Sequence, residues 1–316
     1  MEELVATRDA FGEILLKLGE EDKNLVVLTA DLAESTRVKK FAEKFPERFF
    51  NMGIAEQNMM GVAAGLARCG KTVIATTFAI FASGRAWEQV RYSISHSYLN
   101  VKIVATHGGI SVGEDGSSHQ GTEDISLMRT IPGMKVIVPA DGVETKKAIQ
   151  AAIKVKGPVY IRLGRAKTPV IFKEDYPFQI GRGYIIRKGK DVSIFTCGIM
   201  LSQALKAEEK LKEEGISAEV INISTLKPLD EKIIIESAHS TGAVVTAEEH
   251  QIIGGLGSAV AETLGENYPV PLERIGIKDK FGESGKPEEL FEKYQLTAND
   301  IYKAAKKAIG RKDEKK

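Results

Sequence analysis

Short runs of apolar residues alternate along the chain with longer segments in which apolar residues recur every three or four positions. In the first half, continuous apolar runs cover residues 25–28, 72–76, 101–105, 135–138 and 158–163. Helical periodicity predicts helices at residues 7–19, from about 54 to 68, near 84–97 and at 142–154. Buried parallel strands are typically continuous apolar runs, and strands that alternate with helices favour a mostly parallel sheet covered on both faces.

The periodicity lapses between residues 169 and 189, where proline and glycine accumulate as in a linker. Beyond this stretch, strands are predicted at residues 192–196, 218–223, 243–246 and 272–275. Helices are predicted at residues 201–214, 231–239 and 256–265, and Thr297 caps a last helix. The pattern therefore predicts an α/β protein of two domains, residues 1–168 and 190–316, each with a mostly parallel sheet covered by helices, and 316 residues suffice for both.

Charge and cysteine content exclude several classes of protein. The 44 basic and 43 acidic residues give a net charge of +1, which provides no general argument for binding nucleic acid or an anionic membrane. Cys69 and Cys197 are the only cysteines, so a disulfide framework is excluded and both are predicted to be small buried residues. The N-terminus lacks a signal-peptide pattern and no uncharged run approaches membrane-spanning length, so we expect an unprocessed cytoplasmic protein.

Residues 51–68, which read NMGIAEQNMMGVAAGLAR, form the most informative stretch of the chain. Gly53 frees the backbone before a run of helix formers, which places Glu56 in the first turn of a helix. The helix dipole favours a carboxylate there, so a packed helix with a capping glutamate is one interpretation. Gly61 and Gly65 leave the backbone open to a ligand or another chain, which is the other interpretation.

The densest polar stretch spans residues 106–121, just beyond a predicted strand. Its two histidines, two acids and five glycines are typical of a loop that presents side chains to a ligand. His107, Glu114, Asp115 and His119 are possible metal ligands, but their spacing matches no compact zinc pattern. We therefore predict a loop that faces a ligand and no metal site formed by this chain.

The order of residues from 51 to 66 resembles the signature of the pyrimidine-binding domain of thiamine-diphosphate enzymes of the transketolase group. The resemblance implies that Glu56 hydrogen-bonds N1′ of the cofactor's aminopyrimidine and so helps the cofactor to deprotonate its thiazolium ring. It also implies that Phe78 and Phe81 line the aminopyrimidine pocket, although paired aromatic residues usually serve packing. Gly84 stands where many family members have a tyrosine.

Residues 106–121 are very similar to the transketolase substrate loop. The resemblance implies that His107 and His119 contact donor and acceptor sugars near their reacting carbons, and that Asp115 reads the hydroxyl beside the carbonyl. A histidine titrates near neutral pH, which suits proton transfer between hydroxyl and carbonyl oxygens.

Four further positions match the family more weakly. Arg8, Ser35 and Arg165 match residues that bind the terminal phosphate of the sugar, and guanidinium groups suit its charge and geometry. Asp31 matches an acid near the cofactor.

In the second domain, residues 247–258 contain a glycine-rich turn before a predicted helix. Gly254, Gly255 and Gly257 resemble a weak phosphate-binding loop, since helix N-termini attract anions. The stretch also resembles the C-terminal domain that transketolases share with 2-oxoacid dehydrogenase β-subunits, where it is chiefly structural and helps subunits to assemble. His250 is interpreted as a structural or supporting residue.

The resemblance spans residues 8–309, whereas full-length transketolases are about twice as long. Their first half holds the diphosphate and magnesium with a Gly-Asp-Gly motif and a following asparagine, a pattern that this sequence lacks. The resemblance therefore implies the C-terminal subunit of a split transketolase, paired with an N-terminal subunit that carries the Mg²⁺ ligands, as two of each chain. Thiamine diphosphate would lie between the subunits and support two-carbon ketol transfer between sugar phosphates, with no nucleic acid or membrane partner.

Three alternatives share the fold. A 1-deoxyxylulose-5-phosphate synthase has a similar Ala-Glu-Gln sequence but usually lacks a histidine at His107, and a 2-oxoacid dehydrogenase β-subunit matches residues 106–121 poorly. A catalytically silent scaffold is the third, and the joint retention of Glu56, His107, Asp115 and His119 argues against it.

Overall fold

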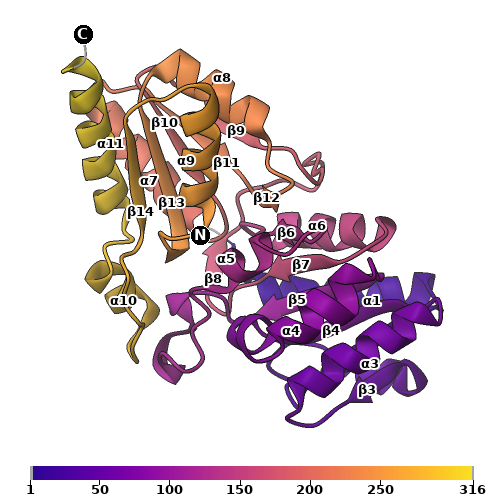
Figure 1. The fold of residues 1–316 in the computed structure, drawn as a ribbon. Helices are drawn as coiled ribbons and strands as arrows, with labels where there is room; N and C mark the ends of the chain where they lie inside the picture. The colour runs from indigo at the N-terminus through magenta and orange to yellow at the C-terminus, as the bar shows by residue number, and fades with distance from the viewer. Residues whose placement is uncertain (1–2, 315–316) are drawn as a thin grey trace.

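The computed structural model describes residues 3–314, which form two lobes that are each built on a β-sheet (Figure 1). The first sheet has seven strands in the order β12-β6-β7-β5-β4-β2-β3. All neighbouring strands in it are parallel except β12 and β6. The strands are β2 (Leu25–Thr29), β3 (Phe49–Asn51), β4 (Thr72–Phe78), β5 (Val101–Thr106), β6 (Lys135–Ile137), β7 (Val159–Arg162) and β12 (Thr225–Lys227).

Helices cover both faces of this sheet. On one face α1 packs against α2 and α6, and on the other lie α3, α5 and two π-helical segments, η2 and η3. The α-helices are α1 (Thr7–Glu21), α2 (Lys39–Lys44), α3 (Glu56–Arg68), α4 (Trp87–Gln89), α5 (Asp124–Arg129) and α6 (Gly142–Lys154). The other helical segments are η1 (Pro46–Arg48), η2 (Phe81–Arg85), η3 (Val90–His96) and η4 (Ile110–Asp115).

The second lobe contains a five-stranded sheet in the order β14-β13-β10-β11-β9, parallel except for β9. Its α7 and α11 pack together against one face, and α8 and α9 pack together against the other (Figure 1). The strands are β9 (Tyr184–Arg187), β10 (Val192–Thr196), β11 (Ala218–Asn222), β13 (Val244–Gln251) and β14 (Leu272–Ile277). The helices are α7 (Met200–Glu213), α8 (Glu231–Thr241), α9 (Leu256–Asn267), α10 (Pro287–Lys293) and α11 (Ala298–Asp313).

The predicted α/β fold with two mostly parallel sheets is confirmed, and the differences lie where the lobes meet. β12 follows β11 in the chain but joins the first sheet beside β6. The stretch predicted as a linker contains β9, and a small antiparallel pair is formed by β1 (Leu4–Ala6) and β8 (Lys167–Pro169). The division of the chain into domains at residues 168 and 190 stays a prediction.

The two cysteines have different surroundings. Cys197 is buried, as predicted, and burial raises the pKa of its thiol. Cys69 lies just after the end of α3 and is exposed, so its predicted burial is wrong. The last buried residue of this helix is Ala64, five positions earlier. None of the helices between residues 3 and 314 combines the length and hydrophobicity that a membrane crossing needs.

A buried carboxyl group joins the two lobes. Glu144 in α6 accepts hydrogen bonds from the Ala140 amide at 2.7 Å, from the Tyr176 hydroxyl at 3.0 Å and from the Asn222 side chain at 2.8 Å. Asn222 ends β11 in the second lobe, so this contact spans the interface. Burial raises the pKa of Glu144 to about 7, although the bonded Ala140 amide lowers it in part.

We expect Glu144→Gln to abolish one component of the pH dependence of stability. Because the pKa of Glu144 is raised from 4.5 to about 7 on folding, the folded chain takes up a proton and is favoured by acid. This contribution is complete below about pH 4.5 and is lost as the pH rises through 7, and it amounts to about 3 kcal/mol. Urea unfolding at pH 5 to 8 measures it as the difference between wild type and variant.

Glu13→Gln is the matched control for this measurement. The Glu13 carboxylate forms an exposed ion pair with the Lys146 amine, 2.8 Å away. Lys146 lies in α6, the helix that also contains Glu144. Its substitution is expected to shift stability by less than about 1 kcal/mol at every pH. Parallel stability profiles for wild type and Glu144→Gln would contradict the assignment.

Candidate active site

The predicted site residues gather beyond the carboxyl ends of the first sheet. Asp31 follows β2, Phe78 ends β4, His107 follows β5 and Arg165 follows β7. Because these strands are parallel neighbours, their carboxyl ends meet at one edge, where ligands of open α/β sheets bind. The topology thus brings together residues that are far apart in the sequence.

Two aromatic rings and two imidazoles form the wall of the site. Phe78 stacks on His107 with ring centroids 3.8 Å apart, and on Phe81 at 5.7 Å. The His119 ring stands edge-on to Phe81 at 5.5 Å and to Phe78 at 6.0 Å. Phe78 is buried, which favours a packing role for this residue. Phe81 is only half-buried, so its ring remains accessible from the site.

His107 is held as a neutral ring. Its Nε2 lies 3.2 Å from Nη1 of Arg8, which can only donate, so Nε2 accepts and Nδ1 carries the proton, 2.8 Å from the Thr106 hydroxyl. Burial lowers the pKa of His107 to about 3, and the positive charges of Arg8 and Arg165 add to the effect. The expectation that this histidine titrates near neutral pH is therefore wrong, because the ring is buried and lies close to cationic side chains.

We expect the ring of His107 not to titrate between pH 5 and 8. In nuclear magnetic resonance spectra, the Cε1 proton of His107 should keep its chemical shift over this range, since the pKa of this ring is lowered to about 3. His107→Asn assigns the signal by removing it. An imidazole signal that moves with a midpoint above pH 5 and vanishes in this variant would contradict the assignment.

The cationic side chains of Arg8 and Arg165 lie near His107. Arg8 donates to the Ser35 carbonyl at 3.2 Å, and Arg165 donates to the Val112 carbonyl at 2.7 Å and pairs with Asp115 at 3.3 Å. Burial, and then the charge of Arg37, lowers the pKa of Arg8. Within residues 3–314, Nε of Arg8 is buried without a hydrogen-bond partner. Such a donor set suits an anion.

Glu56 begins α3 and is only 2% exposed. The helix starts two residues later than predicted, and Gly53 has the positive φ, 69°, that only glycine adopts readily. Nη1 of Arg85 lies 3.0 Å from both carboxylate oxygens of Glu56. Arg85 was not among the predicted site residues, since a lone arginine in a helical segment carries no sequence signal.

Asp31 lies on the exposed approach to α3. Its amide donates to the Asn51 side-chain oxygen at 3.0 Å, and the Asn51 side-chain nitrogen donates to its carboxylate at 3.2 Å. These bonds tie the end of β2 to the loop that leads to Glu56.

A second buried network, which the sequence did not reveal, supports the loop after β5. Arg162 donates through Nε to Asp124 at 3.0 Å and through Nη2 to the Glu249 carbonyl at 2.8 Å, and Tyr160 donates to Asp124 at 2.7 Å. A β-carbon at Gly108 would collide with Arg162, and one at Gly109 would overlap the Glu249 carboxylate. The two glycines after His107 were the available signal: only they allow these charged side chains to pack beneath the loop.

The glycine-rich turn of the second lobe is not an anion site. The amides of Leu256 and Gly257, which open α9, donate to the buried carboxylate of Glu248 at 2.7 and 2.8 Å. A β-carbon at Gly255 would collide with the same carboxylate. These contacts argue against the weak anion-site alternative for Gly254, Gly255 and Gly257 and favour the structural interpretation of the turn. β13 extends through Gln251, and its Glu248 carboxylate already satisfies the N-terminus of α9.

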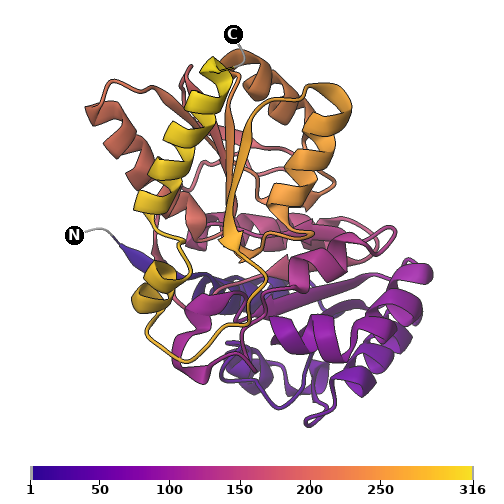
Figure 2. The ribbon, with the colours of Figure 1, turned by 60° about the vertical axis from the view of Figure 1, so that its left-hand side comes forward.

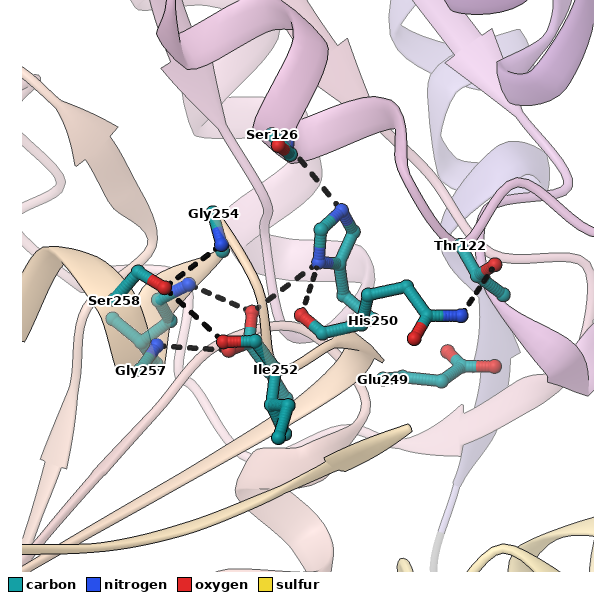
Figure 3. Close-up of polar contacts among 12 residues, drawn as sticks. Thr122, Ser126, Glu249, His250, Ile252, Gly254, Gly257 and Ser258 are labelled. Atoms are coloured by element: carbon teal, nitrogen blue, oxygen red, sulfur yellow. Dashed lines mark hydrogen bonds and ion pairs between the residues drawn. The ribbon is translucent and has the colours of Figure 1, made fainter. Parts of the chain in front are cut away.

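His250 connects the lobes structurally. Figure 3 shows its ring pointing toward Ser126, whose amide donates to Nε2 at 3.3 Å, while Nδ1 lies 2.7 Å from the Gln251 carbonyl. The ring therefore accepts a hydrogen bond at Nε2 and donates one through Nδ1. These contacts favour the structural interpretation of His250.

The second lobe also contacts the loop after β5. α10 packs against η4, which carries Asp115, and the two segments lie side by side in Figure 2. Gln120 donates across this contact to the Glu283 carbonyl at 2.9 Å. A β-carbon at Gly116 would press on the Ser284 hydroxyl.

The chain matches two known domain families. Residues 3–170 match the domain family "Transketolase, pyrimidine binding domain", and residues 181–301 match "Transketolase, C-terminal domain". The chain belongs to the transketolase family. Members of this family are thiamine-diphosphate enzymes that act as transferases, and the resemblance found in the sequence is confirmed.

Three similar proteins cover nearly the whole chain. A "Putative transketolase C-terminal section" of Methanocaldococcus jannaschii is 52% identical over 94% of this chain and 94% of its own length. The 6-deoxy-6-sulfo-D-fructose transketolase subunit of a Clostridium species is 46% identical over 97% of this chain and 95% of its own. A solved structure described as a split gene transketolase, inactive beta4 tetramer, is 54% identical with a TM-score of 0.92, and covers 98% of this chain and 99% of its own.

Proposed function

We propose that this chain is the C-terminal subunit of a split transketolase that transfers a two-carbon ketol unit from a ketose phosphate to an aldose phosphate. The observation that carries the proposal is the convergence of Glu56, Phe81 and the two histidines of the substrate loop beyond one sheet edge. An aminopyrimidine needs a carboxylate at its edge and an aromatic face, and Glu56 and Phe81 offer both. When bound, thiamine diphosphate supplies the carbanion chemistry that breaks and forms the carbon–carbon bond.

The chain's own residues have the following proposed roles. Glu56 hydrogen-bonds the aminopyrimidine and orients it, with Phe78 and Phe81 beside the ring and Asp31 near the cofactor. His107 is neutral, and a substrate hydroxyl donates to its Nε2 in place of Arg8. His119 faces the same space, and Asp115 reads the hydroxyl beside the carbonyl. Because His107 is neutral, it orients substrate hydroxyls by hydrogen bonding and does not act as an acid.

The cationic side chains of Arg8 and Arg165, together with Ser35, are proposed to bind the terminal phosphate of the sugar. Arg8, Ser35 and Arg165 surround a position where a buried guanidinium nitrogen of Arg8 has no partner within residues 3–314. A dianionic phosphate would satisfy it and offset the repulsion among the arginines. The name of the Clostridium relative indicates a sulfonated sugar for that protein, so a sulfonate is the alternative end group to include in assays.

The diphosphate and Mg²⁺ are proposed to bind to a partner subunit in a complex of two chains of each kind. The exposed side of α3, the helix that Glu56 begins, supports this: among the described residues, no atom lies within 4 Å of a β-carbon placed at Gly61 or Gly65. The solved relative that consists of four β chains is described as inactive, which fits a subunit that needs a second kind of chain.

The test is ketol transfer by the complex purified from the native cell extract. Xylulose 5-phosphate and ribose 5-phosphate, with thiamine diphosphate and Mg²⁺, should yield a product two carbons longer than the acceptor, detected by mass spectrometry. The isolated chain should be inactive. Turnover of pyruvate with release of carbon dioxide would instead indicate a synthase or dehydrogenase, and cofactor binding without turnover of any donor would indicate a silent scaffold.

A further inference from the structure

The contact between Arg85 and Glu56 bears directly on cofactor binding. Glu56 is almost fully buried, while the Arg85 side chain is 48% exposed and reaches in to place Nη1 3.0 Å from both carboxylate oxygens. The same guanidinium lies over the Phe81 ring, 4.4 Å from its centroid. Arg85 thus makes two contacts at once, one with the carboxylate and one with an aromatic face.

These are the two contacts that the proposed function assigns to the aminopyrimidine. A guanidinium and a protonated aminopyrimidine are both flat, nitrogen-edged and cationic, so Glu56 and Phe81 accept either. The Arg85 guanidinium and the aminopyrimidine cannot both lie on the same face of the Phe81 ring and within hydrogen-bond distance of the same Glu56 oxygens. A cofactor ring that binds Glu56 must therefore displace Arg85.

The local backbone explains how Arg85 reaches the site. Arg85 ends η2, a π-helical segment, and such segments contain one more residue per turn than an α-helix allows. Its neighbour Gly84 leaves open space, since a β-carbon there would meet only the Ile80 side chain, at 3.8 Å. Gly84, which stands where many family members have a tyrosine, therefore leaves room for the guanidinium to enter and to leave.

We propose that Arg85 is an internal competitor of the cofactor: it occupies the aminopyrimidine position on Glu56 and Phe81, and cofactor binding requires its release into solvent. The inference rests on the proposed function. It adds a regulatory role for Arg85, which lowers affinity for the cofactor by the fraction of molecules in which the pair is closed.

The test compares cofactor affinity in Arg85→Gln and wild-type complexes with the partner subunit. In calorimetric titrations of thiamine diphosphate at saturating Mg²⁺, Arg85→Gln should bind about tenfold more tightly, since a hydrogen-bonded charge pair no longer has to open. Arg91→Gln is the matched control, because Arg91 lies on the same helical stretch, 6.0 Å from the Trp87 ring, and should leave affinity unchanged.

A second measurement on the chain by itself checks the pair without any cofactor. The melting temperature of Arg85→Gln should be lower than that of wild type, because the substitution leaves the buried Glu56 carboxylate without its cation. Adding Arg85→Gln to a Glu56→Gln variant should change the melting temperature little. Equal or weaker cofactor affinity of Arg85→Gln would overturn the inference alone. If the wild-type complex does not bind thiamine diphosphate, the proposed function fails instead.

Discussion

Glu56→Gln is expected to lower ketol transfer by the assembled complex by about 100-fold or more. The carboxylate is buried at the start of α3 with its oxygens directed at the Phe81 side of the site. Gln keeps the size of the side chain but removes the charge and the proton exchange that the aminopyrimidine contact requires. Initial rates with a ketose phosphate and an aldose phosphate, at saturating cofactor and Mg²⁺, measure the loss.

Glu88→Gln is the control, because Glu88 is an exposed glutamate in α4 that pairs only with its neighbour Gln89 among the residues that the structure describes. Native mass spectrometry must show that both variants still assemble with the partner, so that a loss of activity is not a loss of the complex. A Glu56→Gln complex that retains a third or more of wild-type turnover would refute the assigned role.

Asp124→Ala is expected to destabilise the chain by about 3–5 kcal/mol. Asp124 is 1% exposed and accepts from both Arg162 and Tyr160, so its removal leaves a buried guanidinium without its counter-charge and a buried hydroxyl without its acceptor. Urea unfolding, analysed for midpoint and slope, measures the change in the free energy of unfolding.

The matched control is Asp9→Ala, which breaks the pair between Asp9 and Arg37. Their side chains are 37% and 39% exposed, so the expected loss is below about 1 kcal/mol. If Asp124→Ala does not fold, Asp124→Asn keeps the shape and should fold with a smaller loss. A stability for Asp124→Ala within about 1 kcal/mol of wild type would show that the network is not what holds the loop.

The fold was predictable because periodicity reports burial. The apolar runs at residues 25–28 and 72–76 became β2 and β4, which lie side by side in the first sheet. Segments with weak periodicity were missed for the same reason. β12 is three residues long and pairs with a strand from the other lobe, and no local pattern encodes such a partner.

The site was predictable only as a set of motifs. The order of residues from 51 to 66 and from 106 to 121 determined the family, and with it the proposed positions of Glu56, His107, Asp115 and His119. The supporting charges were not predictable in this way. Asp124 and Arg162 are 38 positions apart, and each by itself looks like a surface residue, so only the folded chain shows that they are buried together.

The sequence by itself determined the fold class and the family, because apolar spacing, glycine placement and motif order are local properties of the chain. Only the tertiary structure decided the electrostatic states. It showed that His107 is neutral, that Glu248 satisfies the N-terminus of α9, and that Arg85 holds Glu56. Burial and neighbouring charge set these states, and both depend on which distant segments pack together.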